Sequence, residues 1–185
     1  ILKIDEFNKL ITPIFYGLAC TVPTSVIDNN VLWISGIGNK SFNGIAKFDI
    51  DDNKFENILS NHYSNFSKDN IYSSIMIDDE IWFGLDSYIL VYNTKKDSFR
   101  SLGFEKGIPR GKIIHLEYEN ESVFAGSING VVEIDKTSKA KVNSAIEKFV
   151  FSRNLFLGDI EKFENEVFFV LSNTVFRYEN EKNRT

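Results

Sequence analysis

One short pattern returns at nearly constant spacing along the chain. It appears as ILKID at the start, then as GIAKFD, YILVYN, GVVEID and TVFRYE. The copies share an aliphatic residue, at Ile1, Ile45, Ile89, Val131 and Val175, and the successive steps are 44, 44, 42 and 44 residues. Every copy ends in Asp, Asn or Glu. A repeat of this length restricts the chain to folds built by stacking copies of one small unit.

A second column of residues runs in phase with the first. It consists of large aromatic side chains, at Trp33, Trp82, Phe124 and Phe168, and a polar turn precedes each of them. Two columns in the same phase are difficult to obtain by chance. We expect these four aromatic residues to lie on second strands and to be buried between neighbouring sheets.

The copy at residues 70–99 shows most clearly what one unit contains. β-Branched and aromatic residues dominate residues 71–77, 81–84 and 88–92, a fourth segment follows at 98–102, and short polar turns separate these segments. No helical period is present. The pattern therefore predicts four short strands, arranged as two β-hairpins in tandem.

Four strands in a repeat of 40–50 residues are typical of a β-propeller blade, because one small sheet buries both faces only when neighbours stack on it. We expect an all-β chain of about four blades of four antiparallel strands, which is an arc of a larger propeller. The predicted ranges are a partial blade at 1–15, blades at about 16–60, 61–102 and 103–146, and a partial blade at 147–185. A β-sandwich is the rival fold, but it does not explain the regular spacing.

Residues 107–109, Gly-Ile-Pro, followed by IIHLEYENESVFAGSINGVVEID, resemble the two-component-regulator propeller repeat. The features shared with that family are a Gly-Leu-Pro-like entry, an acidic turn, and the glycines and aspartate at Gly126, Gly130 and Asp135. Trp82 and Gly84 fit it in the preceding copy. The chain also departs from it, since Phe124 and Phe168 replace the tryptophan and Val170 replaces a glycine. Kelch-like and lyase-type propellers stay open as alternatives.

The resemblance implies a non-catalytic binding module, similar to the extracytoplasmic sensing domain of a bacterial two-component regulator. The implied ligand is an oligosaccharide or another small polar molecule, with the signal passed through a neighbouring domain. An intracellular kelch-like scaffold that binds proteins or peptides is the alternative, which makes a cytoplasmic location the alternative as well. A propeller lyase or hydrolase is a third hypothesis.

Composition excludes some classes of partner. The net charge is −5, and Lys and Arg are scattered rather than clustered, which argues against a nucleic-acid partner. No apolar run approaches the roughly 18 residues that a membrane span needs. Cys20 is the only cysteine and is expected to be a small core residue. Because Ile1 falls inside an expected strand, we expect further residues upstream.

Three motifs have both a functional and a structural interpretation. Asp49-x-Asp51-x-Asn53 begins like a calcium loop, but the glycine and the final glutamate of such a loop are missing, so we expect a turn. GIPRGK at 107–112 is one residue short of a phosphate-binding loop and is expected to be a blade connector. His62 and His115 lack the spacing of a zinc site. We therefore expect no metal, no cofactor and no catalytic residues.

The candidate ligand site is predicted from where the repeat accepts extra residues. The interval from Trp33 to Ile45 is 12 residues, whereas the equivalent interval in the other copies is 7, so five extra residues fall in 36–43. In a propeller this loop and the connector at 61–70 open on the same face. Loops combine apolar surface with a few polar groups at many binding sites. The predicted ligand-binding residues are Lys40, Phe42, Asn43, His62, Tyr63, Phe66, Arg110, Lys112 and Arg153; the last three would favour an anionic group.

Overall fold

In the residues that it describes, the computed structural model consists mainly of β-strands, with a short 3-10 helix. It describes residues 2–5, 10–13, 20–21, 24–38, 44–58, 70–108, 110–119, 121–127, 130–135, 142–143, 157–163, 166–171 and 174–179. Contacts divide the chain into two units, unit 1 at Ile1–Asn70 and unit 2 at Ile71–Thr185. Every strand pairing within the sheets is antiparallel.

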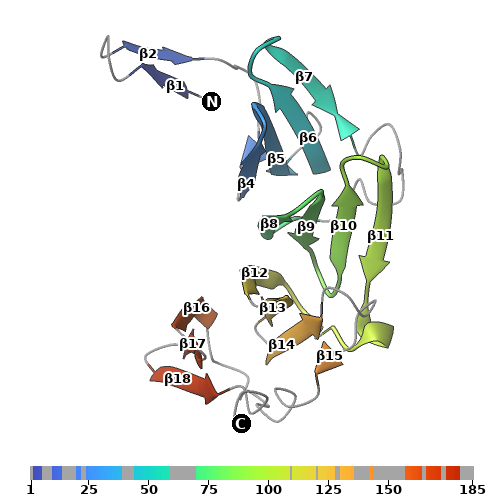
Figure 1. Ribbon diagram of the computed structural model, residues 1–185, viewed down its shortest axis with the longest axis vertical. Coiled ribbons are helices and arrows are strands. Elements are labelled where there is room, and N and C mark those ends of the chain that lie inside the picture. The colour runs from blue at the N-terminus through green and yellow to red at the C-terminus, as the bar shows by residue number, and fades with distance from the viewer. Residues whose placement is uncertain are drawn as a thin grey trace. The chain divides into compact units, whose positions relative to one another are not determined.

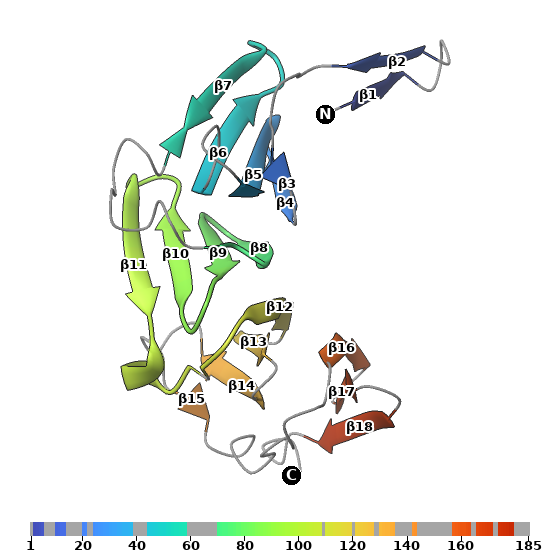
Figure 2. The ribbon, with the colours of Figure 1, turned by 180° about the vertical axis from the view of Figure 1, so that it is seen from behind.

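Unit 1 contains a hairpin and a larger sheet (Figure 1). The hairpin pairs β1 (Leu2–Asp5) with β2 (Leu10–Pro13). The sheet contains β3 (Cys20–Thr21), β4 (Ser25–Asp28), β5 (Val31–Gly38), β6 (Gly44–Asp49) and β7 (Lys54–Asn57). Both β3 and β4 pair with β5, and Figure 2 shows them on the same side of it. The first strand of this sheet is therefore present in two pieces.

Unit 2 contains three successive sheets, each following the chain from strand to neighbouring strand. The first has β8 (Ser73–Ile77), β9 (Glu80–Gly84), β10 (Ile89–Asn93) and β11 (Ser98–Leu102). The second has β12 (Ile113–Glu119), β13 (Ser122–Ser127), β14 (Gly130–Asp135) and β15 (Val142–Asn143). The third has β16 (Leu157–Phe163), β17 (Glu166–Leu171) and β18 (Thr174–Glu179). The helix η1 (Phe104–Lys106) follows β11.

The sheets of unit 2 stack through their first strands. β12 contacts β8 and β9 of the sheet before it and β16 of the sheet after it. Four-stranded meanders stacked in this order are blades of a β-propeller, so the predicted fold class is confirmed. The positions at which one blade ends and the next begins stay a prediction.

The hairpin turns depend on polar residues that accept a left-handed backbone. Asn29, Asn30, Asp78 and Glu121 have φ between 45° and 65°, and each lies in a turn between a first and a second strand. Asn and Asp adopt this conformation more readily than most residues because their short polar side chains bond locally. This requirement explains the Asn and Asp residues of the turns before Trp33 and Trp82.

The acidic or amide residue that ends the third strands has a different role. The Oδ1 atom of Asp49 accepts the N–H groups of Asp51 and Asp52, and Oδ1 of Asn93 accepts the N–H of Lys96. Such bonds build the turn into the fourth strand. The Asp49 segment is therefore a turn, as predicted. The outer strand that follows it is β7, which ends at Asn57.

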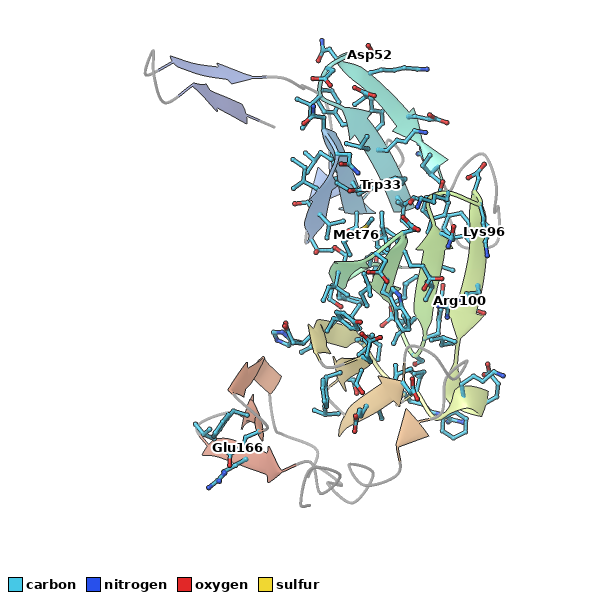
Figure 3. The ribbon with its side chains drawn as sticks, viewed as in Figure 1. Trp33, Asp52, Met76, Lys96, Arg100 and Glu166 are labelled. Atoms are coloured by element: carbon cyan, nitrogen blue, oxygen red, sulfur yellow. The ribbon has the colours of Figure 1, made fainter. Side chains whose placement is uncertain are left out.

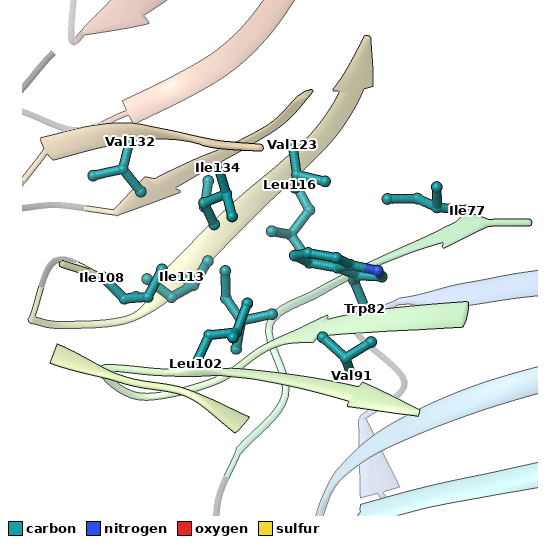
Figure 4. Packing of buried hydrophobic residues seen from close by; sticks show 12 residues of the cluster. Ile77, Trp82, Val91, Leu102, Ile108, Ile113, Leu116, Val123, Val132 and Ile134 are labelled. Carbon is teal, nitrogen blue, oxygen red and sulfur yellow. The ribbon is translucent and has the colours of Figure 1, made fainter. Parts of the chain in front are cut away.

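The core of unit 2 lies between its first two sheets (Figure 4). Trp82 and Val91 project from the first sheet towards Leu116 and Val123 of the second, and Ile108 of the connector completes the cluster. All five side chains are buried. The indole ring of Trp82 also lies 5.1 Å from the guanidinium carbon of Arg100. Because one cluster spans two sheets and their connector, the two sheets form a single core.

The aromatic column is buried in three of its four positions. Trp33 on β5, Trp82 on β9 and Phe124 on β13 are buried, whereas Phe168 on β17 is only partly buried. The face of the first sheet that carries Trp82 is covered by the second sheet. Among the described residues of unit 2, no sheet follows β18, and Val175 on the face of Phe168 is 63% exposed. The expectation of a fully buried Phe168 is therefore wrong.

Each sheet also carries a polar pair on its aromatic face. The pairs are Lys47 Nζ with Glu56 at 3.0 Å, Arg100 with Glu80 at 2.6 Å, Ser122 Oγ with Glu133 at 2.7 Å, and Arg177 with Glu166. Figure 3 shows Arg100 and Glu166, on β11 and β17, among these residues. The pairs made by Lys47, Arg100 and Arg177 are partly exposed, so each adds little stability by itself.

In unit 2, the contact between the sheet of β8–β11 and the sheet of β12–β15 requires a glycine at position 84. A Cβ atom on Gly84 would lie 2.3 Å from Ser73 Oγ and 2.4 Å from the carbonyl oxygen of Ile113. Ser73 Oγ donates a buried hydrogen bond to that same carbonyl, at 2.8 Å. A side chain at position 84 would therefore separate β9 from the start of β12.

We predict that Gly84→Ala lowers the free energy of unfolding by about 1–3 kcal/mol, because backbone and Ser73 must shift to admit the methyl group. Urea unfolding followed by tryptophan fluorescence measures this loss. The matched control is Gly103→Ala, whose Cβ would meet the flexible end of Glu105 instead. Equal stabilities of the two variants would contradict the close contact.

A second prediction concerns the aromatic column. Trp82→Ala should lower the free energy of unfolding by about 3–5 kcal/mol, because it leaves a large cavity in the core. Phe168→Ala should cost clearly less, since that ring is only partly buried. Thermal unfolding of the two variants beside the parent chain gives the comparison, and a larger loss for Phe168→Ala would show that the assigned faces are wrong.

Candidate functional site

The structure describes two of the nine predicted ligand-binding residues. These are Arg110 and Lys112, in the connector between β11 and β12. The other seven lie outside the described residues: Lys40, Phe42, Asn43, His62, Tyr63, Phe66 and Arg153. The structural evidence for a site therefore comes from the connector and from the residues that contact it, all of them in unit 2.

The structure describes the first three residues of the insertion at 36–43. The extra residues were expected in the loop after β5, yet β5 itself continues through Ile37 and Gly38, which pair with Thr21 and Cys20. Part of the insertion therefore lengthens a strand. Residues 39–43 lie outside the described residues.

The connector is hydrogen-bonded to the loop between β9 and β10. Ser87 N–H donates to the Gly111 carbonyl at 2.8 Å, and Gly111 N–H donates to Ser87 Oγ at 2.9 Å. One residue pair further along, Ile113 N–H donates to the Leu85 carbonyl at 2.9 Å. Ser87 and Gly111 both have positive φ, 70° and 102°. In this copy of the repeat, the loop after the second strand and the connector therefore lie side by side. The same arrangement stays a prediction for 36–43 and 61–70, because residues 39–43 and 61–69 lie outside the described residues.

Three side chains meet at this hydrogen-bonded junction, and we call them the junction trio: Tyr72, Asp86 and Lys112. The Tyr72 hydroxyl donates to Asp86 Oδ2 at 3.1 Å, and Lys112 Nζ lies 5.0 Å from the centre of the Tyr72 ring. Asp86 and Lys112 also form a backbone bridge. Both charged side chains are exposed, and Tyr72 is half-buried. The trio therefore presents a carboxylate, a phenol and an ammonium group on one small area of surface.

Arg110 has a separate partner. Its guanidinium carbon lies 4.6 Å from the centre of the Phe104 ring, in the short helix that follows β11. Phe104 is 62% exposed although it is a large hydrophobic residue. An exposed aromatic ring with an arginine over it is a common element of binding surfaces. Lys112 therefore contacts the other members of the trio, whereas Arg110 contacts Phe104.

Sequence reasoning did not find Tyr72, Asp86 or Phe104. Tyr72 precedes the first strand, and Asp86 looks like an ordinary turn residue. The proximity of Tyr72 and Asp86 to Lys112 follows from the pairing of a loop with a connector about 25 residues later, which no local pattern shows. The one available signal was the repeat itself, because it puts this loop and this connector on one face.

Among the described residues, no three His, Cys, Asp or Glu side chains come together as a group that could hold a metal ion. His115 lies on β12 and is half-buried. No helix in the described part of the chain is long and apolar enough to cross a membrane.

Comparison with known proteins shows similarity of fold. No protein-family model matches the chain, and no curated protein matches it. Among solved structures, it is similar to the extracellular domain of BT4673 from B. thetaiotaomicron, which is described as a one-component system in one structure and as a hybrid two-component system in another. The TM-score is 0.67 at 22% identity, over 89% of this chain.

Two further solved structures are similar over most of the chain. One is a chain of the mitotic checkpoint complex, with a TM-score of 0.59, 10% identity and 91% of this chain covered, against 54% of its own length. The other is PorZ, a surface component of the type-IX secretion system of Porphyromonas gingivalis, with a TM-score of 0.51, 13% identity and 86% covered, against 21% of its own length. The chain spans about a fifth of the length of the BT4673 domain, 21%.

The Ser87–Gly111 contact gives a prediction about local order. Ser87→Ala removes the acceptor of the Gly111 N–H, so hydrogen exchange at Gly111 should become about tenfold faster, a change equivalent to ~1.4 kcal/mol. Amide hydrogen exchange measured by NMR reports on the Gly111 N–H directly. Ser101→Ala, at an exposed position of β11, is the control and should leave Gly111 unchanged. An unaltered Gly111 exchange rate in Ser87→Ala would show that this bond does not hold the connector.

Proposed function

We propose that the chain is a non-catalytic ligand-binding segment of a β-propeller sensing module, and that its ligand is a small polar molecule such as an oligosaccharide. The observation that carries the proposal is the junction trio. It places an acceptor, a donor and part of an aromatic ring together, on a backbone that the Ser87–Gly111 bonds hold in place. Binding sites combine apolar surface with a few fixed polar groups in this way.

The chemistry of the trio suits a polyhydroxylated ligand. Asp86 Oδ2 accepts one hydrogen bond from Tyr72, and an ionised carboxylate has about four acceptor positions, so others are available to hydroxyl donors. The ammonium of Lys112 donates up to three bonds. A sugar with neighbouring hydroxyl groups can use the carboxylate and the ammonium together.

The fold similarity supports a sensing role. BT4673 is described as a one-component or a hybrid two-component system, and the solved part is its extracellular domain. We propose by analogy that this chain belongs to an extracytoplasmic domain of the two-component-regulator propeller family and that a neighbouring domain passes on the signal. Phe42 and Tyr63, which lie outside the described residues, stay predicted ligand-binding residues in this proposal.

A second candidate function is a scaffold that binds a protein or peptide. The observation in its favour is the exposed Phe104 beside Arg110, since aromatic and arginine side chains provide much of the energy of protein interfaces. The two functions use different residues of one connector. Variants of Lys112 and of Phe104 therefore separate them.

The test is a binding screen of the chain against oligosaccharides and peptides, followed by titration of each ligand found. Lys112→Ala should weaken binding of an oligosaccharide about tenfold to a hundredfold, because a charge-assisted hydrogen bond is lost. The matched control is Lys96→Ala, at an exposed turn between β10 and β11.

Three other outcomes of the screen are informative. Affinity that falls in Phe42→Ala and Tyr63→Ala but not in Lys112→Ala would place the site on the segments that carry Phe42 and Tyr63. Binding of a peptide that is lost in Phe104→Ala alone would favour the scaffold. An absence of any binding to either panel would contradict both functions.

A further inference from the structure

The connector that carries Lys112 differs in charge from the rest of the protein. Its residues 103–112, GFEKGIPRGK, contain three basic residues and one acidic residue, whereas the whole chain has a net charge of −5. Lys106, Arg110 and Lys112 are all exposed. A cationic segment on an acidic protein produces a local positive potential that attracts an anionic ligand.

Hydrogen bonds hold the backbone on both sides of Lys112 in place. The residues on both sides of it, Gly111 and Ile113, are hydrogen-bonded to the preceding loop, and Lys112 itself is bridged to Asp86. Ile113 is buried in the core of unit 2. Fixing the backbone lowers the entropy that ligand binding costs, because only the side chain must be ordered. Lys112 is thus better placed to hold an anion than a lysine on a free loop.

Asp86 restricts what kind of anion fits. Its exposed carboxylate belongs to the same trio as Lys112, so a compact ion such as phosphate or sulfate would meet a negative charge next to the positive one. A larger ligand avoids this repulsion if its anionic group and its hydroxyl groups are separated. The hydroxyl groups then donate to Asp86 while the anionic group reaches Lys112.

We propose that the junction trio binds an acidic oligosaccharide, with the carboxylate of a uronic acid unit at Lys112 and sugar hydroxyl groups at Asp86. Tyr72 supplies the adjoining apolar surface. Arg110, on the same connector, adds long-range attraction for further acidic units of the chain. This inference rests on the proposed function and specifies the class of ligand.

The test compares two disaccharides that differ at one group. One contains glucuronic acid, and the other has glucose in its place, so that a CH2OH group replaces the carboxylate. Calorimetric titration should show the acidic disaccharide binding about tenfold tighter. That preference should disappear in Lys112→Gln, persist in the control Lys96→Gln, and shrink at high salt. Asp86→Asn should weaken the binding of both disaccharides, since it replaces an ionised acceptor.

The remaining outcomes separate this inference from the proposed function. Equal affinity for the two disaccharides would overturn the acidic ligand and leave an oligosaccharide-binding role intact. Inorganic sulfate that displaces the acidic disaccharide at equal concentration would also overturn it, because the site would then recognise a simple anion. If neither disaccharide bound and the wider oligosaccharide panel also failed, both the inference and the proposed function would be wrong.

Discussion

The joining of the first two sheets of unit 2 depends on the close approach of β9 to the start of β12. Gly84 has no side chain, so the carbonyl of Ile113 can come near enough to accept the buried hydrogen bond from Ser73. Ile113 in turn belongs to the core shared by the two sheets, and its N–H is bonded to Leu85. The absence of a side chain at Gly84 thus permits the close contact between β9 and β12, the buried hydrogen bond from Ser73 to Ile113, and the packing of the shared core.

The repeat predicted the fold because its columns correspond to positions with fixed physical roles. Aromatic residues recur at 33, 82 and 124 because this position of the second strand is buried in each of these three copies. Asp49 and Asn93 end third strands because their side chains bond the N–H groups of the following turn. Such roles are local or repeated in every copy, and they are therefore visible in a single sequence.

The candidate site was much harder to predict, since it depends on where a loop and a connector come together. Lys112 was identified from its charge, but Tyr72 and Asp86 carry no local sign that they lie beside it. The partial exposure of Phe168 was missed for a related reason. The column assigns the residue to a face, whereas its burial depends on what covers that face, which a repeat pattern does not specify.

The location of the trio has a consequence for sensing. Tyr72 and Asp86 belong to the first sheet of unit 2, while Lys112 directly precedes β12 of the second. A ligand that contacts Asp86 and Lys112 together therefore joins two sheets, next to the Ser87–Gly111 bonds that already connect them. Ligand binding free energy is then added to the stability of the contact between the sheets, because the ligand binds only when both groups are in place. Under the proposed sensing role, the ligand would therefore act by stiffening the contact between two adjacent sheets of the propeller.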